Sequence, residues 1–455
     1  MTLYLRGDEG YEQARTRRIF NARRPERFPA AVLEASDATD VAAGLRLAID
    51  RDWPVSVRAG GHSWAAWSVR DDALLIDLAA LNSLDYDETS GVVSAGPAVR
   101  GGAELAPYLE ARGRAFPGGH CPTVGIGGFL LQGGQGWNSR AMGWACESVV
   151  AVDVVTADGN VMRADAQQHS DLYWAARGAG PGFPGIVTTF HLQTYPMPAV
   201  MWHDTWTFRL DDGADVLRWL HELLPTLDRR AEPVLAATRL PEVPLHAGTD
   251  HPGGTVLLLH TTVLADSDDE ARALLAPFAT CPATPRALGH ACGPTTLAAE
   301  NRAQEAQNPP GYRYAVDCAW TNAPADTLAP LLEDIWHGLD TPHSFSIWYG
   351  WAPQRPLPDM AFSVEANVYI ATYLVYTDPA DDERYRTLVH KQTAAIARDG
   401  GAGAYLGDTD FTRRNDRFLT DAHFERLNRI RTQRDPSGRF VSYLSDDAAH
   451  LNRHD

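Results

Sequence analysis

Two glycine-rich segments contain the side chains of this chain that are best suited to holding a reactive group. Residues 55–63 read VSVRAGGHS and carry His62, and residues 116–143 carry Cys121 close to their start. Glycine loses more backbone freedom on folding than any other residue, so this density suits backbone that approaches a large flat molecule or adopts positive φ. We predict that the two segments hold one cofactor between them, with His62 and Cys121 as its anchors.

Other motifs with known chemistry fit the sequence poorly. The dinucleotide fingerprint GxGxxG needs a third glycine, but residues 125–127 are followed by Leu130 at that place and residues 178–180 by Phe183. The sequence has no P-loop, no HExxH and no cysteine–histidine group at metal-ligand spacing, which argues against a metal site. It has no GxSxG motif, which argues against a hydrolase of that type.

The first glycine-rich segment follows a predicted strand–helix–strand unit. Ala31–Ala35 and Pro54–Arg58 have strand composition, and between them Ser36 begins a helix whose apolar residues recur at helical spacing. The unit ends in the run AGGHS. Because consecutive glycines after a strand can turn several N–H groups toward an anion, a diphosphate would suit this end.

The chain divides into three predicted parts: residues 1–198, 199–402 and 403–455. Prolines at 196 and 198 mark the first boundary, and the last part contains a predicted helix at 421–431. In the middle part, strands alternate with helices, which predicts a large, mostly antiparallel sheet backed by helices. Its strands are expected at 201–210, 256–263, 314–320, 344–350 and 368–376, and its helices at 214–227, 267–277, 327–338 and 381–398.

The predicted sheet is rich in tryptophan and tyrosine. Aromatic residues form strands well and fill cores, which is sufficient to explain any one of them. Together, their polar tips also suit the wall of a pocket for a ring-bearing substrate. The residues are Trp202, Trp206, Trp320, Trp348, Tyr349, Trp351, Tyr369, Tyr373 and Tyr376.

Composition restricts the partners. The 455 residues carry a formal net charge of −18, so neither a nucleic acid nor an anionic membrane is an expected partner. Six arginines between Arg15 and Arg27 are predicted to face water.

The five cysteines include no CxxC, so a disulfide framework is not expected, with a Cys281–Cys292 pair as an alternative. No signal peptide or membrane-spanning apolar run is visible, so we expect a cytoplasmic protein, either a monomer or a homodimer.

Four segments in order resemble the FAD domain of the vanillyl-alcohol-oxidase superfamily, most closely its berberine-bridge-enzyme-like branch. They are PVSVRAGGHSW, GGHCPTVGIGGFLLQGGQG, SRAMGWACESVVAVDVVTADG and DLYWAARGAGPGFPGIVT. AYLGDTD and HFERLNRIRTQRDPSGRF resemble the closing segment of that branch. The resemblance covers about residues 26–198 and 404–440. The middle part shares only a general alternation of strands and helices with the family and no specific motif. It implies an α+β fold, with a two-part PCMH-type FAD-binding domain and a substrate domain built on a large antiparallel sheet.

The resemblance also implies how the FAD is held. His62 is expected to bond to the flavin 8α-methyl carbon and Cys121 to flavin C6, and a neutral imidazole and a thiolate are the nucleophiles that could add to an electron-poor ring. Residues expected at the diphosphate are Arg58, Ala59, Gly60, Gly61 and Ser63. Residues expected along the flavin are Thr123, Val124, Gly125, Gly127, Gly128, Gly133 and Gly136, with Gly185, Ile186 and Val187 at the adenine or ring edge.

The sequence departs from the family at three places near the expected site. Phe129 stands where the family often has histidine, and Gly407 stands where its closing segment often has asparagine. Residues 361–364 read AFSV in place of a Phe-Pro-His-Arg-like run. The substrate-side chemistry of well-known members therefore cannot be transferred as a whole.

The reaction implied by the resemblance is a two-electron oxidation of an alcohol, which is a sugar, glycoside or secondary-metabolite hydroxyl. A base takes the proton, a hydride passes to flavin N5, and O2 is reduced to hydrogen peroxide. Alternatives are a dehydrogenase that reacts slowly with O2, an oxidative cyclase, and a non-catalytic flavin-binding protein. Tyr405 is the first candidate for the base, and the weaker candidates are Tyr349, Tyr369, Tyr373 and Glu365.

Overall fold

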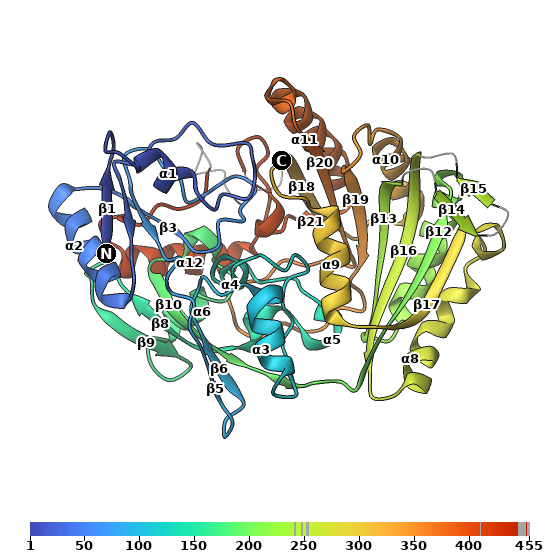
Figure 1. The fold of residues 1–455 in the computed structure, drawn as a ribbon, viewed down its shortest axis with the longest axis horizontal. Helices are drawn as coiled ribbons and strands as arrows, with labels where there is room; N and C mark the ends of the chain where they lie inside the picture. Colours follow the sequence, from blue (N-terminus) through green and yellow to red (C-terminus); the bar gives the residue numbers. More distant parts are fainter. Residues whose placement is uncertain (241–242, 247–248, 252–253, 410, 445–451, 453–455) are drawn as a thin grey trace.

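The computed structural model describes residues 1–240, 243–246, 249–251, 254–409, 411–444 and 452. Two smaller sheets from the N-terminal part lie on one side of the molecule, and one large sheet from the middle of the chain lies on the other (Figure 1). This arrangement of helices and sheets confirms the α+β class. No helix among the described residues is both long and apolar enough to cross a membrane.

The first small sheet contains the predicted strand–helix–strand unit. Helix α2 (Ala38–Arg51) connects β2 to β3, and each of these strands pairs in parallel with β4, which lies between them. The side chain of Asp37 caps the helix by accepting a hydrogen bond from the Asp40 amide. The buried face of this helix packs on the sheet, which fixes where the chain emerges as the AGGHS run. The sheet order is β1-β2-β4-β3, with β1 (Thr2–Leu5), β2 (Ala31–Glu34), β3 (Val55–Arg58) and β4 (Leu74–Asp77).

The second small sheet is antiparallel and five-stranded. Its core side packs on short helices, among them α3 (Ala106–Glu110), α4 (Ile126–Leu131) and α6 (Ser170–Ala175). The first strand, β5, was not predicted, because LDYD has only two apolar positions and is half exposed. The order is β5-β6-β10-β8-β9, with β5 (Leu84–Asp87), β6 (Val92–Ala95), β10 (Ile186–Gln193), β8 (Val149–Val155) and β9 (Val161–Asp165).

The large sheet has eight antiparallel strands, which confirms the prediction of a large antiparallel sheet in the middle of the chain. Three of them, β13, β17 and β21, were missed: Pro233 interrupts one strand pattern, GHACGPT makes the edge strand atypical, and β21 is only three residues, Gly-Ala-Gly. The order is β17-β12-β16-β13-β19-β20-β18-β21. The strands are β12 (Val200–Phe208), β13 (Ala231–Leu240), β16 (Gly254–Ala265), β17 (Gly289–Thr295), β18 (Arg313–Thr321), β19 (Phe345–Gly350), β20 (Val368–Tyr376) and β21 (Gly401–Gly403).

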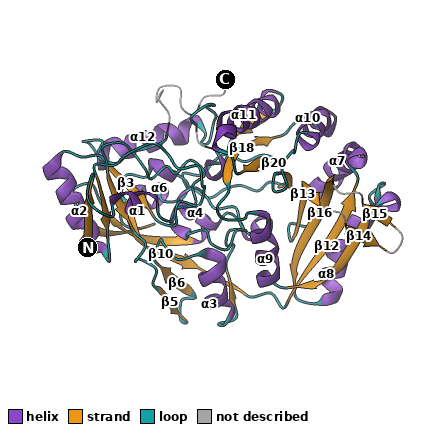
Figure 2. Ribbon diagram, turned by 45° about the horizontal axis from the view of Figure 1, so that its top comes forward, coloured by secondary structure: helices purple, strands orange, loops and turns teal. Residues whose placement is uncertain are grey.

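The two faces of the large sheet have different neighbours. Side chains alternate along a strand, so Leu235 and Ala237 of β13 pack into the core under the helices, whereas Val234 and Ala236 point to the other face. Figure 2 shows helices along the outer side of the sheet and α9 (Leu297–Gln307) on the inner side. The outer helices are α7 (Gly213–Leu223), α8 (Asp268–Leu275), α10 (Ala325–His337) and α11 (Asp382–Arg398).

The C-terminal segment lies against the N-terminal part. Helix α12 (Asp421–Arg434) runs beside α6, and Arg434 forms an ion pair with Asp171 at 2.7 Å (Figure 1). Phe440 then forms a bridge to Val55 of β3. The tail thereby closes over the strand that leads into the first glycine-rich segment.

Three sequence-based interpretations need correction. The arginines between Arg15 and Arg27 are mostly not solvated: Arg15 is buried and Arg27 donates to the carbonyl of Val69 at 2.6 Å, because these guanidiniums hold loop backbone. All five cysteines are free, so the Cys281–Cys292 pair does not form. Most of the sheet aromatics fill cores, and only Tyr349, Tyr369 and Tyr373 of that set line a cavity.

Candidate active site

One cavity of about 570 Å³ lies between the glycine-rich segments and the inner face of the large sheet. That size is within the usual range for small-molecule sites. It is lined by most of the predicted cofactor-binding residues, namely Arg58, Ala59, Gly60, Gly61, His62, Ser63, Cys121, Val124, Gly125, Gly127, Gly128, Gly185, Ile186, Val187 and Tyr405. The candidate base residues Tyr349, Tyr369 and Tyr373 also line it.

The two glycine-rich segments meet through a direct backbone contact. A Cβ on Gly60 would lie 2.6 Å from the amide nitrogen of Gly125, and a Cβ on Gly125 would lie 2.7 Å from the Cα of Gly60. Neither backbone can move away without moving its whole loop, so both positions require glycine. This contact brings the segments of His62 and Cys121 to the same cavity.

Three predicted residues do not reach the cavity, and the reason is packing within the protein. Gly133 makes room for the Phe362 ring, which a Cβ would approach to 2.7 Å, and Gly136 makes room for the carbonyl of Gly118. Thr123 instead lies beside Cys121, with its Oγ1 3.6 Å from Sγ. Part of the glycine content of the second segment is therefore explained by close packing within the protein rather than by a bound molecule.

His62 and Cys121 are in different chemical states. Burial lowers the pKa of His62 to about 4, so its imidazole is neutral and nucleophilic at pH 7. Its ring stacks on Phe20 at a centroid distance of 4.4 Å, which orients it. Burial raises the pKa of the Cys121 thiol, against the opposing hydrogen bond with Thr123, so the thiolate must be generated locally before it can react.

The side chain of Arg58 has a structural role. Its Nε and one terminal nitrogen donate to Asp77 Oδ2 at 2.9 and 2.6 Å, and its other terminal nitrogen donates to the carbonyl of Arg15 at 2.6 Å. Both members of the pair are fully buried. The ion pair therefore joins β3 to β4 immediately before the AGGHS run and leaves only the main chain of Arg58 to face a ligand.

Ile186 and Val187 present one free backbone edge. Both residues pair with β8, but the pairing of β10 with β6 begins only at Phe190. The main-chain groups on the β6 side of Ile186 and Val187 therefore have no ladder partner in the second sheet. They lie on the cavity wall, where a hydrogen-bonding ligand edge can use them.

Asp408 is a cavity residue that the sequence interpretation missed. Its Oδ2 accepts hydrogen bonds from the hydroxyls of Tyr369 and Tyr373 at 2.5 and 3.0 Å, and its Oδ1 accepts one from the indole of Trp64 at 2.7 Å. Burial raises the pKa of Asp408 even though these three donors favour the carboxylate. The available signal was an acidic residue in the AYLGDTD tail motif, directly after Gly407.

Tyr405 is held differently from the other tyrosines. Its hydroxyl oxygen accepts hydrogen bonds from the backbone amides of Gly134 and Gln135 at 3.2 and 3.3 Å. Burial raises its pKa above the ordinary tyrosine value, and the charge of Asp408 adds to that effect. Both influences oppose the loss of a proton from Tyr405, which weakens it as a base.

A second carboxylate–tyrosine pair lies on the cavity wall. The hydroxyl of Tyr349 donates to Glu232 Oε1 at 2.7 Å, and the amide of Arg140 donates to the same oxygen at 3.1 Å. Burial raises the pKa of both Glu232 and Tyr349. The sequence interpretation also missed Glu232, because it lies in the unpredicted strand β13.

The structure does not bring Glu365 to the cavity. Its Oε2 accepts hydrogen bonds from the indoles of Trp144 and Trp351 at 2.8 and 2.9 Å. These contacts direct the carboxylate into the aromatic core that lies behind Tyr405. Glu365 therefore has a packing role here and lies outside the set of side chains that face a ligand.

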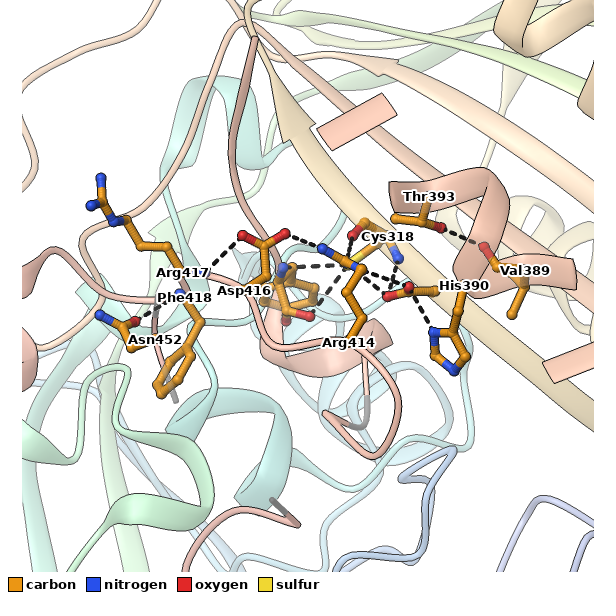
Figure 3. Close-up of polar contacts among 11 residues, drawn as sticks. Cys318, Val389, His390, Thr393, Arg414, Asp416, Arg417, Phe418 and Asn452 are labelled. Atoms are coloured by element: carbon orange, nitrogen blue, oxygen red, sulfur yellow. Dashed lines mark hydrogen bonds and ion pairs between the residues drawn. The ribbon is translucent and has the colours of Figure 1, made fainter. Parts of the chain in front are cut away.

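A buried ionic network anchors the segment that carries Tyr405 and Asp408. Arg414 donates to both carboxylate oxygens of Asp317 at 3.0 Å and to the carbonyl of Cys318 at 2.8 Å (Figure 3). His390 Nδ1 lies 2.9 Å from Asp317 Oδ2. Because Asp317 and Cys318 belong to β18, the network holds the segment with residues 404–409 and 411–416 over the edge of the large sheet and thereby positions the cavity side chains.

Replacing Asp317 with asparagine is expected to lower the free energy of unfolding by about 2 kcal/mol, because it removes one of the two carboxylates that pair with buried Arg414 and leaves only Asp416. Burial alone would raise the pKa of Asp317, but Arg414 and His390 outweigh it and hold this pKa at about 2, below the ordinary 3.8. The stabilisation is thus complete above about pH 4 and is lost as pH falls toward 2. Urea unfolding at a series of pH values measures both effects, and exposed Asp269→Asn, expected to change stability by less than about 0.5 kcal/mol, is the control.

The structure also assembles a histidine–glutamate group that sequence spacing could not reveal. His203 of β12, His260 of β16 and Glu300 of α9 have ligand atoms within 4.8 Å of one another. Glu300 accepts hydrogen bonds from both imidazoles, at 3.2 and 3.1 Å, and from Thr295 at 2.6 Å. His260 and Glu300 line the cavity, whereas His203 does not. The expectation that the sequence contains no metal-spaced cluster therefore does not extend to the tertiary structure.

Comparison with known proteins identifies the relatives of this chain. The family described as "FAD binding domain" matches residues 29–165. The FAD-linked oxidoreductase janO of Penicillium janthinellum is 35% identical over 433 residues, which cover 94% of each chain. A carbohydrate oxidase of Microdochium nivale is 34% identical over 185 residues, 40% of this chain and 37% of its own. The solved structure of the BBE-like 1 protein of Physcomitrella patens has a TM-score of 0.82 at 20% identity and covers 100% of this chain and 97% of its own.

Proposed function

The chain belongs to the FAD-linked oxidoreductases, and from that membership we propose that it is an oxidase whose FAD is bonded to both His62 and Cys121. The observation that carries the proposal is that these two nucleophiles, 59 positions apart in the sequence, line one cavity. The proposed substrate is an alcohol, on a sugar, a glycoside or a secondary metabolite, and the proposed electron acceptor is O2.

The residues around the cavity fit an FAD. The neutral imidazole of His62 and the thiol of Cys121 are nucleophilic side chains of types that can bond to an isoalloxazine ring. Gly128 has open space where its Cβ would be, and the main chain of Ile186 and Val187 offers an unpaired edge. A bound FAD would supply the acceptor for a hydride, and O2 would reoxidise it with formation of hydrogen peroxide. His62 and Cys121 would hold it in the cavity through one bond each.

The chain must also remove a proton from the substrate hydroxyl. We assign this to Asp408, acting through Tyr369 or Tyr373: the tyrosine oxygen takes the substrate proton while the tyrosine proton moves to Asp408 Oδ2. The raised pKa of Asp408 supports the assignment, because a base works best when its pKa approaches the working pH. Burial and Asp408 raise the pKa of Tyr369, Tyr373 and Tyr405 alike, so the hydrogen-bond partners distinguish them. The hydrogen bonds that Tyr405 accepts from Gly134 and Gln135 support a different role for it, which is to fix that loop.

We expect a panel of sugars, glycosides and polycyclic alcohols to contain compounds that bleach the flavin spectrum without oxygen and yield one hydrogen peroxide per turnover with oxygen. The reason is the pairing of a flavin site with proton-accepting groups on one cavity wall. Bleaching is followed by absorption at the flavin bands, and peroxide by a coupled peroxidase. Bleaching without peroxide would contradict the oxidase and favour a dehydrogenase or cyclase. A spectrum unchanged by every compound would favour a binding protein without catalysis.

A further inference from the structure

The inner face of the large sheet forms a floor under the cavity. Along β13 the cavity-lining residues are Glu232, Val234, Ala236 and Thr238, and along β16 they are Leu258, His260 and Thr262. These are alternate residues, so over this stretch the inner-facing side chains of both strands line the cavity, while residues between them, such as Leu235 and Leu259, pack in the core under the outer helices.

One row of directly paired residues runs across this floor to the proposed reaction centre. His260 pairs with Val234, Val234 pairs with Tyr349, and Tyr349 pairs with Tyr369. Paired residues in an antiparallel sheet place their side chains on the same face, and neighbouring strands lie about 4.8 Å apart. His260 is therefore about 14 Å from Tyr369, three strand spacings away.

The floor between these two ends is apolar. Ala236 pairs with Leu258 on one side and with Ile347 on the other, and all three line the cavity beside Val234. A hydroxyl group placed over this surface would lose its hydrogen bonds to water without gaining a protein partner. A carbohydrate, which carries hydroxyls along its whole length, is poorly matched to such a floor, whereas fused hydrocarbon rings are well matched.

The far end of the floor carries polar side chains, and hydrogen bonds within the protein fix their orientation. His260 Nδ1 lies 2.7 Å from the hydroxyl of Thr205, and its Nε2 lies 3.1 Å from Glu300 Oε2. Burial alone would raise the pKa of Glu300, but the hydrogen bonds from His203 and His260 hold it well below the ordinary value, so the carboxylate is charged. Gln304 of α9 lines the cavity one helical turn from Glu300. Both ring nitrogens of His260 are thus engaged, and this side chain orients Glu300. The carboxylate of Glu300 can accept a further hydrogen bond and the side-chain amide of Gln304 can donate one, so this end can bind one polar group of a ligand.

We infer that the substrate is an elongated, rigid, apolar polycyclic alcohol with a second polar group at its far end. The reacting hydroxyl lies at Tyr369 and Tyr373, the fused rings lie over Ala236 and its neighbours, and the second polar group is held by Glu300 and Gln304. This inference rests on the proposed function for the position of the reaction centre. It selects among the substrate classes left open there and disfavours oligosaccharides.

Anaerobic titration of the flavin-containing protein tests the inference by binding alone. The ligands are 17β-estradiol, a tetracyclic diol with one hydroxyl at each end, its 3-deoxy analogue, and cellobiose. Binding is measured as the change in the flavin absorption spectrum. We expect estradiol to bind at least tenfold more tightly than cellobiose, and Ala236→Trp, which fills the floor, to weaken estradiol binding at least tenfold. Cellobiose binding as tightly as estradiol would overturn the inference.

Two variants separate the ligand-binding groups of the polar end from the rest of the cluster. Gln304→Leu is expected to weaken estradiol binding about tenfold and to leave binding of the 3-deoxy analogue unchanged. His203→Gln is the matched control, since His203 contacts Glu300 but lies outside the cavity lining. Equal effects of the two variants, together with stoichiometric Zn²⁺ binding that His203→Gln abolishes, would make the group a metal site and overturn the assignment. Because binding is read without turnover, failure of the oxidase proposal remains distinguishable from failure of this one.

Discussion

Alanine at both His62 and Cys121 is expected to release all of the flavin when the purified protein is denatured, whereas the unaltered protein keeps it. A covalent bond survives unfolding, and the backbone contacts from the glycine-rich segments do not. Each single variant retains one bond, so its flavin stays attached but its absorption spectrum shifts. Intact mass spectrometry under denaturing conditions, with and without the flavin mass, measures the effect.

Two matched variants show whether attachment is specific to these positions. His120 lies next to Cys121 on the same cavity wall, and burial lowers its pKa to about 4, so it is an equally neutral imidazole. His120→Ala and exposed Cys292→Ser are expected to leave the flavin mass in place. Flavin lost from the unaltered protein on denaturation would refute both bonds. Flavin retained by the double variant would place the attachment elsewhere.

Asparagine at Asp408 is expected to slow reduction of the flavin by substrate between 10²- and 10⁴-fold, the usual loss when a general base is removed. The amide keeps the size of the carboxylate but cannot accept the proton passed on by Tyr369 or Tyr373. In the unaltered protein the rate should rise with pH through the raised pKa of Asp408, because only the carboxylate accepts the proton. The asparagine variant should lose that pH dependence. Stopped-flow anaerobic reduction at a series of pH values measures both.

Tyr405→Phe ranks the two candidate bases. The Tyr405 hydroxyl accepts hydrogen bonds from Gly134 and Gln135, so its removal should loosen that loop and reduce the rate modestly without changing its pH dependence. A larger loss in Tyr405→Phe than in Asp408→Asn, with the flavin still attached in both, would return the role of base to Tyr405. Full activity of Asp408→Asn would exclude Asp408 outright.

The difference between sequence and structure at the site is clearest for the acidic residues. Glu365 is one of the weaker candidates for the base from sequence, yet it accepts hydrogen bonds from Trp144 and Trp351, away from the cavity. Asp408 reaches the cavity and accepts a hydrogen bond from Trp64, 344 positions earlier. A contact between such distant positions cannot be predicted from the local pattern of residues, so only the folded chain shows that Asp408 faces the cavity and Glu365 does not.

The sequence by itself determined the class of fold and, through motifs that resemble a known family, the FAD-binding character; His62 and Cys121 as anchors stay a proposal. The class of fold depends on local features, namely strand and helix periodicity and the capping of α2 by Asp37. Tertiary structure alone decided which glycines serve packing, which tyrosines face the cavity, and how Asp408, Glu232, His260 and Glu300 come together. Those outcomes follow from the register of the eight-stranded sheet and from the tail segment packed over its edge. Both are set by contacts between residues far apart in the chain, which no local pattern encodes.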